Sequence, residues 1–361
     1  MKRNHSNISL SLTLSDSNIL KGVALLFLLV HHLFYIRNGR FDDIEIFDGH
    51  YLVNMIGLAC KVCVPMFVFL SGYGLTASAE KLGKIKLSQF YIHRFTKLYF
   101  NYWLIWLLFV PIGVFVCGLT FDAVYGEHVL PKFLLDFLGL INIFGLYGYN
   151  PTWWFYSCII VLYLLFPFIV AGCKHRWCIQ AIFWVSLAIT LCPFTLIQPI
   201  RFYLITFVLG CFFRNGLIHN ILPPLFNKLI YRCLNGELSR LEILIILVVV
   251  ISYIPLRLIV PYALVFDTII TILLIFLYKN IKIHRFVSSF LHFCGKHSFN
   301  IFLFHTFLFY LYIPQIIYWH RNPVVIFTTL ILFCLLISCL IEEGKKKLGY
   351  YKILQTINSK Q

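Results

Sequence analysis

Long apolar runs recur along the chain at a spacing that matches the thickness of a bilayer. Ten such runs are separated by shorter polar or basic stretches. Because the hydrocarbon core is roughly 30 Å thick and backbone groups in lipid must bond within their own segment, each run predicts a membrane-spanning helix. The predicted spans are 19–36, 52–76, 98–118, 152–171, 177–195, 200–216, 240–259, 262–279, 298–319 and 323–343.

One further apolar run, 132–147, differs from the ten because Asp136 and Asn142 interrupt it. A run this short and polar is typical of an interfacial or re-entrant segment, so we do not expect an eleventh span. We find no repeat of 20 to 50 residues and no low-complexity linker. The sequence therefore predicts a single all-α membrane domain over residues 1–361.

The distribution of basic residues predicts the orientation of this domain. With the N-terminus inside, 23 of the 30 Lys and Arg fall in cytoplasmic segments. Cytoplasmic loops of membrane proteins carry such an excess, so we expect both termini in the cytoplasm and the protein in the cytoplasmic membrane of the cell. The first external loop is acidic, and the external stretch 119–151 is the longest on its side.

Composition excludes a soluble protein and narrows the choice of partners. Hydrophobic residues make up 60% of the chain and charged residues 12%, about half the charged fraction of ordinary soluble domains. The net charge of +16 is explained by the cytoplasmic loops, so nucleic acid is not an expected partner. The 12 cysteines show no zinc-type spacing with histidines, and we expect reduced thiols and no metal site.

Three histidines lie inside predicted spans, where ionisable side chains usually have a function. His31 and His32 follow Lys21 by ten and eleven residues, about three turns or roughly 16 Å of helix. His305 follows Ser298 by seven residues and so shares its helix face. A neutral histidine can act as a general base. The alternative is a packed histidine bonded to a carbonyl, and for Ser298 a helix N-cap.

A second group of candidates lies near the cytoplasmic side of the second and third spans. The second span ends with Ser71 in a Ser-Gly-Tyr-Gly sequence that allows close backbone approach. Arg94 and Lys97 are three residues apart at the start of the third span and share a face. They could clamp a phosphate or pyrophosphate, or they could anchor the chain to anionic lipid, which is the commoner use of such residues.

Other polar or aromatic residues have both structural and functional explanations. Lys61 and Asp267 are charges of opposite sign inside predicted spans, where they could pair or line a polar path. Trp153 and Trp154 begin the fourth span on the external side. They fit an aromatic belt at the membrane interface or a wall on which a sugar ring stacks.

Five of these motifs, in this order, resemble the acyltransferase-3 family of integral membrane O-acyltransferases. Lys21-Gly-Val-Ala through His32 is similar to the family's basic residue with the essential histidine eleven positions later, which selects His32 over His31. The segments 64–73, 94–99, 154–155 and 295–305 resemble the Phe-Phe-x-x-Ser-Gly-Tyr/Phe, Arg-x-x-Arg, Trp-Phe-Leu and Gly-x-x-Ser to Leu-x-His elements. Ten spans with both termini inside also agree with the family.

The resemblance implies transfer of an acetyl or other short acyl group from cytoplasmic acetyl-CoA to a sugar hydroxyl of an envelope polysaccharide or lipid-linked sugar. It implies that His32 is the base or a transient acyl carrier, assisted by His305 and Ser298. Arg94 and Lys97, with Lys21 and Ser71, would bind the donor, and Trp153, Trp154 and residues 119–151 would face the acceptor. Lys21 and Lys97 stand where the family more often has arginine, which removes one bidentate partner for phosphate.

A different class of protein also accounts for ionisable residues inside the spans. A secondary transporter, or a flippase for a lipid-linked sugar or small anion, would show intramembrane His, Lys and Asp and broken helices. We find no inverted repeat that would favour a transporter. A structural or sensory protein is a third interpretation, under which replacing His32 or Arg94 by alanine would have no effect.

Overall fold

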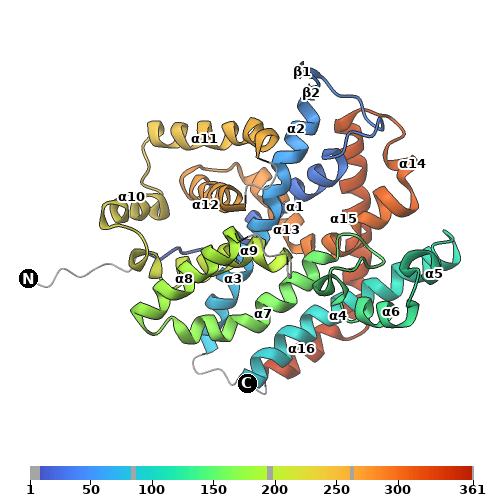
Figure 1. Cartoon of the computed structure of the whole chain (residues 1–361), viewed down its shortest axis with the longest axis horizontal. Helices are drawn as coiled ribbons and strands as arrows, with labels where there is room; N and C mark the ends of the chain where they lie inside the picture. The colour runs from blue at the N-terminus through green and yellow to red at the C-terminus, as the bar shows by residue number, and fades with distance from the viewer. Residues whose placement is uncertain (1–8, 83–86, 193–197, 261–263, 360–361) are drawn as a thin grey trace, which may run out of the picture.

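The structure, a computed structural model, describes residues 9–82, 87–192, 198–260 and 264–359 and is almost entirely helical (Figure 1). Its elements are α1 (Leu14–Phe34), β1 (Glu45–Phe47), β2 (His50–Tyr51), α2 (Leu52–Ala59), η1 (Cys60–Val62), α3 (Cys63–Leu82), α4 (Leu87–Phe115), α5 (Phe121–Tyr125), α6 (Val129–Phe137), η2 (Ile141–Phe144), α7 (Trp154–Gly172), α8 (Arg176–Leu191), α9 (Gln198–Arg214), η3 (Leu217–Asn220), α10 (Pro224–Asn235), α11 (Arg240–Ile259), α12 (Leu264–Asn280), α13 (Arg285–Thr306), η4 (Phe307–Tyr312), α14 (Pro314–Ile317), α15 (Pro323–Lys347) and α16 (Tyr350–Ser359).

Each of the ten predicted spans falls on a helix, which confirms an all-α membrane protein. Within the described residues, six helical segments are long and apolar enough to cross a bilayer: α1, the continuous α2-η1-α3, α4, α7, α11 and α15. The helices α8, α9 and α12 are shorter, and α13 carries more polar side chains. The end of predicted span 177–195 and the start of 262–279 lie outside the described residues.

Two predicted helix starts were wrong. The third helix, α4, begins at Leu87 and not at residue 98, so Arg94 and Lys97 lie within it. Helix α13 begins at Arg285, where the His284 side chain accepts a hydrogen bond from the backbone N–H of Phe286, so Ser298 is not its N-cap. The error has a physical cause, because hydropathy detects the part of a helix that suits lipid, whereas an amphipathic helix continues beyond that part.

The segment 132–147 does not form a span. It folds as α6 and the single turn η2, and α6 ends just before Gly139, whose φ of 68° is left-handed. A helix of nine residues is only about 14 Å long, too short to cross the bilayer. Together with α5 it lies at one edge of the molecule, beside α4 (Figure 1).

Helices α1 and α13 pack side by side at the centre of the fold (Figure 1). They run in the same direction, because Asn18 contacts His292 and His32 contacts His305. Two glycines permit this approach. A Cβ atom on Gly22 would lie 2.0 Å from the carbonyl oxygen of Leu291, and one on Gly295 would lie 1.8 Å from that of Asn18. Only a residue without a side chain fits at either position, so the two helices are in backbone contact close to their middle turns.

A second close pair, α3 and α9, confirms the expected close approach at the end of the second span. A Cβ on Gly72 would lie 2.3 Å from the carbonyl oxygen of Phe207, and one on Gly210 would lie 2.3 Å from that of Phe69. Gly74 has nothing within 4 Å of its Cβ position, so only the first glycine of the Ser-Gly-Tyr-Gly sequence is needed for packing.

Candidate functional site

The parallel pair α1 and α13 brings two histidines from opposite ends of the sequence together. The ring centroids of His32 and His305 are 5.0 Å apart. His305 is fully buried, whereas His32 is half-buried. His31 points elsewhere, since its Nδ1 lies 2.8 Å from the carbonyl oxygen of Gly57 on α2. We call His32 and His305 the histidine pair.

The contacts of His305 define its tautomer. Its Nδ1 lies 3.0 Å from the carbonyl oxygens of both Ile301 and Phe302. Carbonyl oxygens only accept, so Nδ1 carries the proton and Nε2 of the neutral ring has a free lone pair. The hydroxyl of Thr306 lies 3.5 Å from this Nε2. His305 is therefore held as an acceptor within the site.

The ring nitrogens of His32 make no hydrogen bond within the described ranges. The ring is bordered by His305, by Phe309 at 6.2 Å and by Tyr35 at 6.1 Å between centroids. A half-buried imidazole without a partner is available to accept a proton from another molecule.

Sequence reasoning missed a polar chain behind His305. The Thr152 hydroxyl donates to Asn150 Oδ1 at 2.7 Å and lies 3.0 Å from the hydroxyl of Thr306. All three side chains are buried. The Asn-Pro-Thr sequence before Trp153 could have revealed these hydrogen bonds, because polar side chains that are buried at the start of a helix need hydrogen-bond partners.

Three cations gather around the N-terminal halves of α1 and α4. Lys21 interacts electrostatically with both Arg94 and Lys97. Within the described part of the chain, none of the three has an ion pair or a side-chain hydrogen bond. Like charges held together without counter-ions raise the free energy of the fold, and an anion placed between them would lower it. We call Lys21, Arg94 and Lys97 the cation cluster.

Ser71 and Ser298 both lie near this group. Tyr163 interacts with the side chain of Ser71 and lies within electrostatic range of Arg94, so Ser71 borders the cation cluster. Ser298 is buried and its Oγ donates to the carbonyl oxygen of Gly295 at 2.8 Å. Seven residues of helix, about 10 Å, separate Ser298 from His305. Ser298 therefore lies between the levels of the cation cluster and the histidine pair.

The structure separates the two tryptophans that we expected to face the acceptor. Trp153 is 1% exposed, donates through Nε1 to the carbonyl oxygen of Leu303 at 2.9 Å, and packs on Tyr102. A ring enclosed in this way offers no face to a sugar, so the expectation for Trp153 was wrong. Trp154 is half-buried and stacks on Tyr203, with 6.0 Å between the ring centroids.

Asp267 has its ion pair with a residue that sequence reasoning overlooked. Arg257 Nη1 lies 3.4 Å from Asp267 Oδ1, and Tyr253 donates to the same oxygen. Arg257 was missed because it stands near the end of an otherwise apolar run. Lys61 contributes electrostatically to the surroundings of Asp267. Asp267 thus forms an ion pair that joins α11 to α12, and Lys61 lies within electrostatic range of this pair.

Comparison with known proteins identifies the class to which this chain belongs. The chain matches the family model described as an acyltransferase domain over residues 14–343, nearly its whole length. With its apolar spanning helices, the protein is thus a membrane acyltransferase. The chain belongs to the acyltransferase-3 family. No curated protein and no solved structure matches it.

Proposed function

We propose that this protein is an O-acyltransferase of the cytoplasmic membrane. It moves an acetyl or other short acyl group from acyl-CoA to a hydroxyl of an envelope polysaccharide or a lipid-linked sugar. The observation that carries the proposal is the arrangement along α1. One half of this helix contributes Lys21 to an unpaired cation cluster, and the other half contributes His32 to the histidine pair.

The cation cluster is the proposed binding site for the phosphates of the donor. Arg94 can bind phosphate through two parallel N–H donors, whereas Lys21 and Lys97 act as point charges. The eleven residues from Lys21 to His32 correspond to roughly 16 Å of helix. The extended pantetheine arm of coenzyme A suits such a separation, since its thioester lies far from its phosphates. Donor binding and chemistry therefore take place at different ends of one helix pair.

The histidine pair is the proposed centre of the reaction. His32 accepts the proton of the acceptor hydroxyl as the oxygen attacks the thioester carbonyl. The carbon–sulfur bond breaks, and the coenzyme leaves as a thiol that takes up this proton. His305, with its free Nε2, stabilises the positive charge that develops on His32. Ser298 lies on the path between donor phosphates and histidines, where it can contact the acyl chain.

The acceptor is proposed to approach from the external side, past Trp154 and the segment 119–151. Trp154 is half-buried and keeps part of one ring accessible, unlike Trp153. Aromatic faces bind the apolar faces of sugar rings, so Trp154 is the residue of this pair that we propose for acceptor binding.

The proposal is tested by the ester content of envelope glycans. Mass spectrometry of cells with and without the gene should show a loss of O-acyl groups, and the lost mass identifies both acyl group and acceptor. Cells that carry Arg94→Gln should show the same loss, whereas Arg176→Gln, at an exposed arginine on α8, should have no effect. Unchanged esters in the cells without the gene would reject the proposed function.

A further inference from the structure

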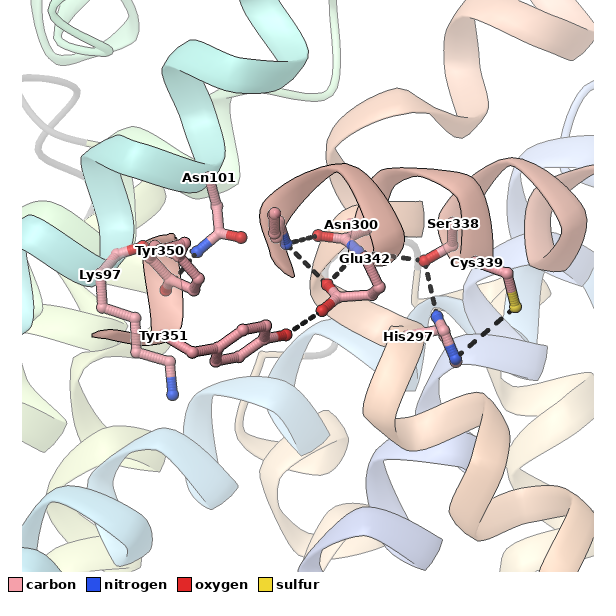
Figure 2. A network of polar contacts seen from close by, with 10 residues as sticks. Lys97, Asn101, His297, Asn300, Ser338, Cys339, Glu342, Tyr350 and Tyr351 are labelled. Atoms are coloured by element: carbon pink, nitrogen blue, oxygen red, sulfur yellow. Dashed lines mark hydrogen bonds and ion pairs between the residues drawn. The ribbon is translucent and has the colours of Figure 1, made fainter. Parts of the chain in front are cut away.

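A buried network of polar side chains lies beside the cation cluster and joins α13, α15 and α16 (Figure 2). Glu342 is at its centre. Its Oε1 accepts from Lys345 Nζ at 2.7 Å and from Asn300 Nδ2 at 2.7 Å. Its Oε2 accepts from the hydroxyl of Tyr351. Both carboxylate oxygens therefore accept hydrogen bonds, and these bonds fix the orientation of the carboxylate group.

The inner part of the network is rigid because every member has a partner. Lys345 is 3% exposed and also donates to Asn300 Oδ1 at 2.6 Å. Asn300 Nδ2 donates to Ser338 Oγ at 3.1 Å, and Nδ1 of His297 lies 2.8 Å from the same hydroxyl. The carboxylate of Glu342 is thus held on Lys345 by a scaffold from two helices.

The outer part of the network is the C-terminal helix α16, which lies beyond the family match that ends at residue 343. Tyr350 stacks on Phe100 of α4 at 4.3 Å, and its hydroxyl accepts from Asn101 Nδ2 at 3.3 Å. The same amide nitrogen donates to the backbone oxygen of Lys97 at 2.6 Å. Helix α16 is therefore attached both to Glu342 and to the turn of α4 that carries Lys97.

Lys97 lies within electrostatic range of Glu342 and Lys345. Even so, no ion pair or hydrogen bond reaches its ammonium group within the described ranges. Figure 2 shows the Lys97 side chain extending past Tyr351, with its nitrogen directed away from Glu342. Lys97 is exposed. If Glu342 were released from its partners, its carboxylate would compete with phosphate for Lys97. Both groups accept hydrogen bonds from the same ammonium donors.

We propose that α16 completes the donor site, with Tyr351 as a positioning residue that keeps Oε2 of Glu342 engaged and so leaves Lys97 free for the phosphates of acyl-CoA. This inference rests on the proposed function. It assigns a role in donor binding to a helix outside the family domain. The role is indirect, because Tyr351 acts through Glu342 and not through contact with the donor.

The test is the affinity of the purified full chain, in lipid nanodiscs, for coenzyme A. Tyr351→Phe should weaken binding about fivefold, an effect typical of a partly exposed charge-assisted contact. It should raise KM for acetyl-CoA and leave kcat unchanged. In a Glu342→Gln background the charge that competes for Lys97 is absent, so adding Tyr351→Phe should have no further effect on affinity. A double-mutant cycle measures this coupling.

Three controls make the outcome decisive. Tyr231→Phe removes a hydroxyl from a tyrosine on α10 and should bind coenzyme A like wild type. The exposed fraction of Tyr231 is 39%, close to the 41% of Tyr351. Thermal unfolding checks each variant. Should Glu342→Gln fail to fold with Lys345 left unpaired, Glu342→Gln/Lys345→Gln removes both charges together and serves as the background.

Two results would overturn the inference while leaving the proposed function in place. One is a Tyr351→Phe protein that binds coenzyme A as wild type does. The other is a double variant that binds as weakly as Tyr351→Phe alone, because the loss would then not pass through Glu342. A wild-type chain that does not bind coenzyme A would instead contradict the proposed donor, and the inference would be lost with it.

Discussion

At the scale of single residues, the site depends on which nitrogen of each histidine is free. The carbonyls of Ile301 and Phe302 hold Nδ1 of His305, whereas no described residue bonds the ring of His32. The sequence, through its resemblance to the family, selected His32 over His31 and associated it with His305. It could not predict the tautomer, or that Trp153 is enclosed, since both depend on residues distant in the chain.

His305→Asn tests the residue-scale account. The shorter amide can still donate to the carbonyls of its own helix but removes the ring that faces His32. We expect acyl transfer to fall by about 100-fold or more, as for the loss of a group assisting general base catalysis, with the thermal unfolding midpoint little changed. His50→Asn, on the short β-hairpin at a half-buried histidine, is the matched control. Transfer at the wild-type rate by His305→Asn would remove His305 from the site.

At the scale of elements, glycine contacts set the distance between the helices that carry the site. Hydropathy predicted the positions of the helices, because burial in lipid requires apolar runs. It missed the amphipathic starts of α4 and α13. Glu342 and Lys345 gave no signal in the sequence, since paired charges at the end of an apolar helix look like solvated ones.

Gly22→Ala tests the element-scale account. The added methyl group would lie 2.0 Å from the carbonyl oxygen of Leu291, so α1 and α13 must separate. We expect a loss of activity together with a lower unfolding temperature, because the histidine pair is carried by these two helices. Gly74→Ala, which meets nothing within 4 Å, should leave both unchanged. Equal activity for the two variants would show that the helix contact does not position the site.

The edge element formed by α5, α6 and η2 depends on a buried carboxylate. Asp136, which lies outside the membrane-spanning helices, is fully buried and accepts from the Tyr149 backbone at 2.6 Å and the Tyr125 hydroxyl at 2.8 Å. Burial raises its pKa from 3.8 to about 6, with these hydrogen bonds opposing the rise.

Asp136 predicts a pH dependence of stability. Because its pKa is higher in the folded chain, the folded chain binds more protons than the unfolded chain between about pH 4 and pH 6. Stability should therefore fall as the pH rises through this window, by at most about 3 kcal/mol. Asp136→Asn should remove that dependence in unfolding curves measured from pH 4 to pH 7. A wild-type curve with the opposite slope would contradict the assignment.

At the scale of the whole molecule, the fold places the cation cluster and the histidine pair toward opposite ends of a parallel helix pair. The order of the motifs in the sequence predicted this separation, since a helix converts eleven residues into roughly 16 Å. What the sequence could not provide is the packing that surrounds the pair. The unpaired state of Lys21, Arg94 and Lys97, and the attachment of α16 next to them, arise only from contacts between distant segments.

The most direct test of this account measures the two ends of the helix pair in one protein. Purified wild-type chain and His32→Ala are placed in envelope membranes with labelled acetyl-CoA, and both coenzyme binding and label in the glycan are measured. We predict that His32→Ala binds coenzyme A as wild type does and transfers no label. Label transferred by His32→Ala at the wild-type rate would contradict the central claim that this histidine performs the chemistry.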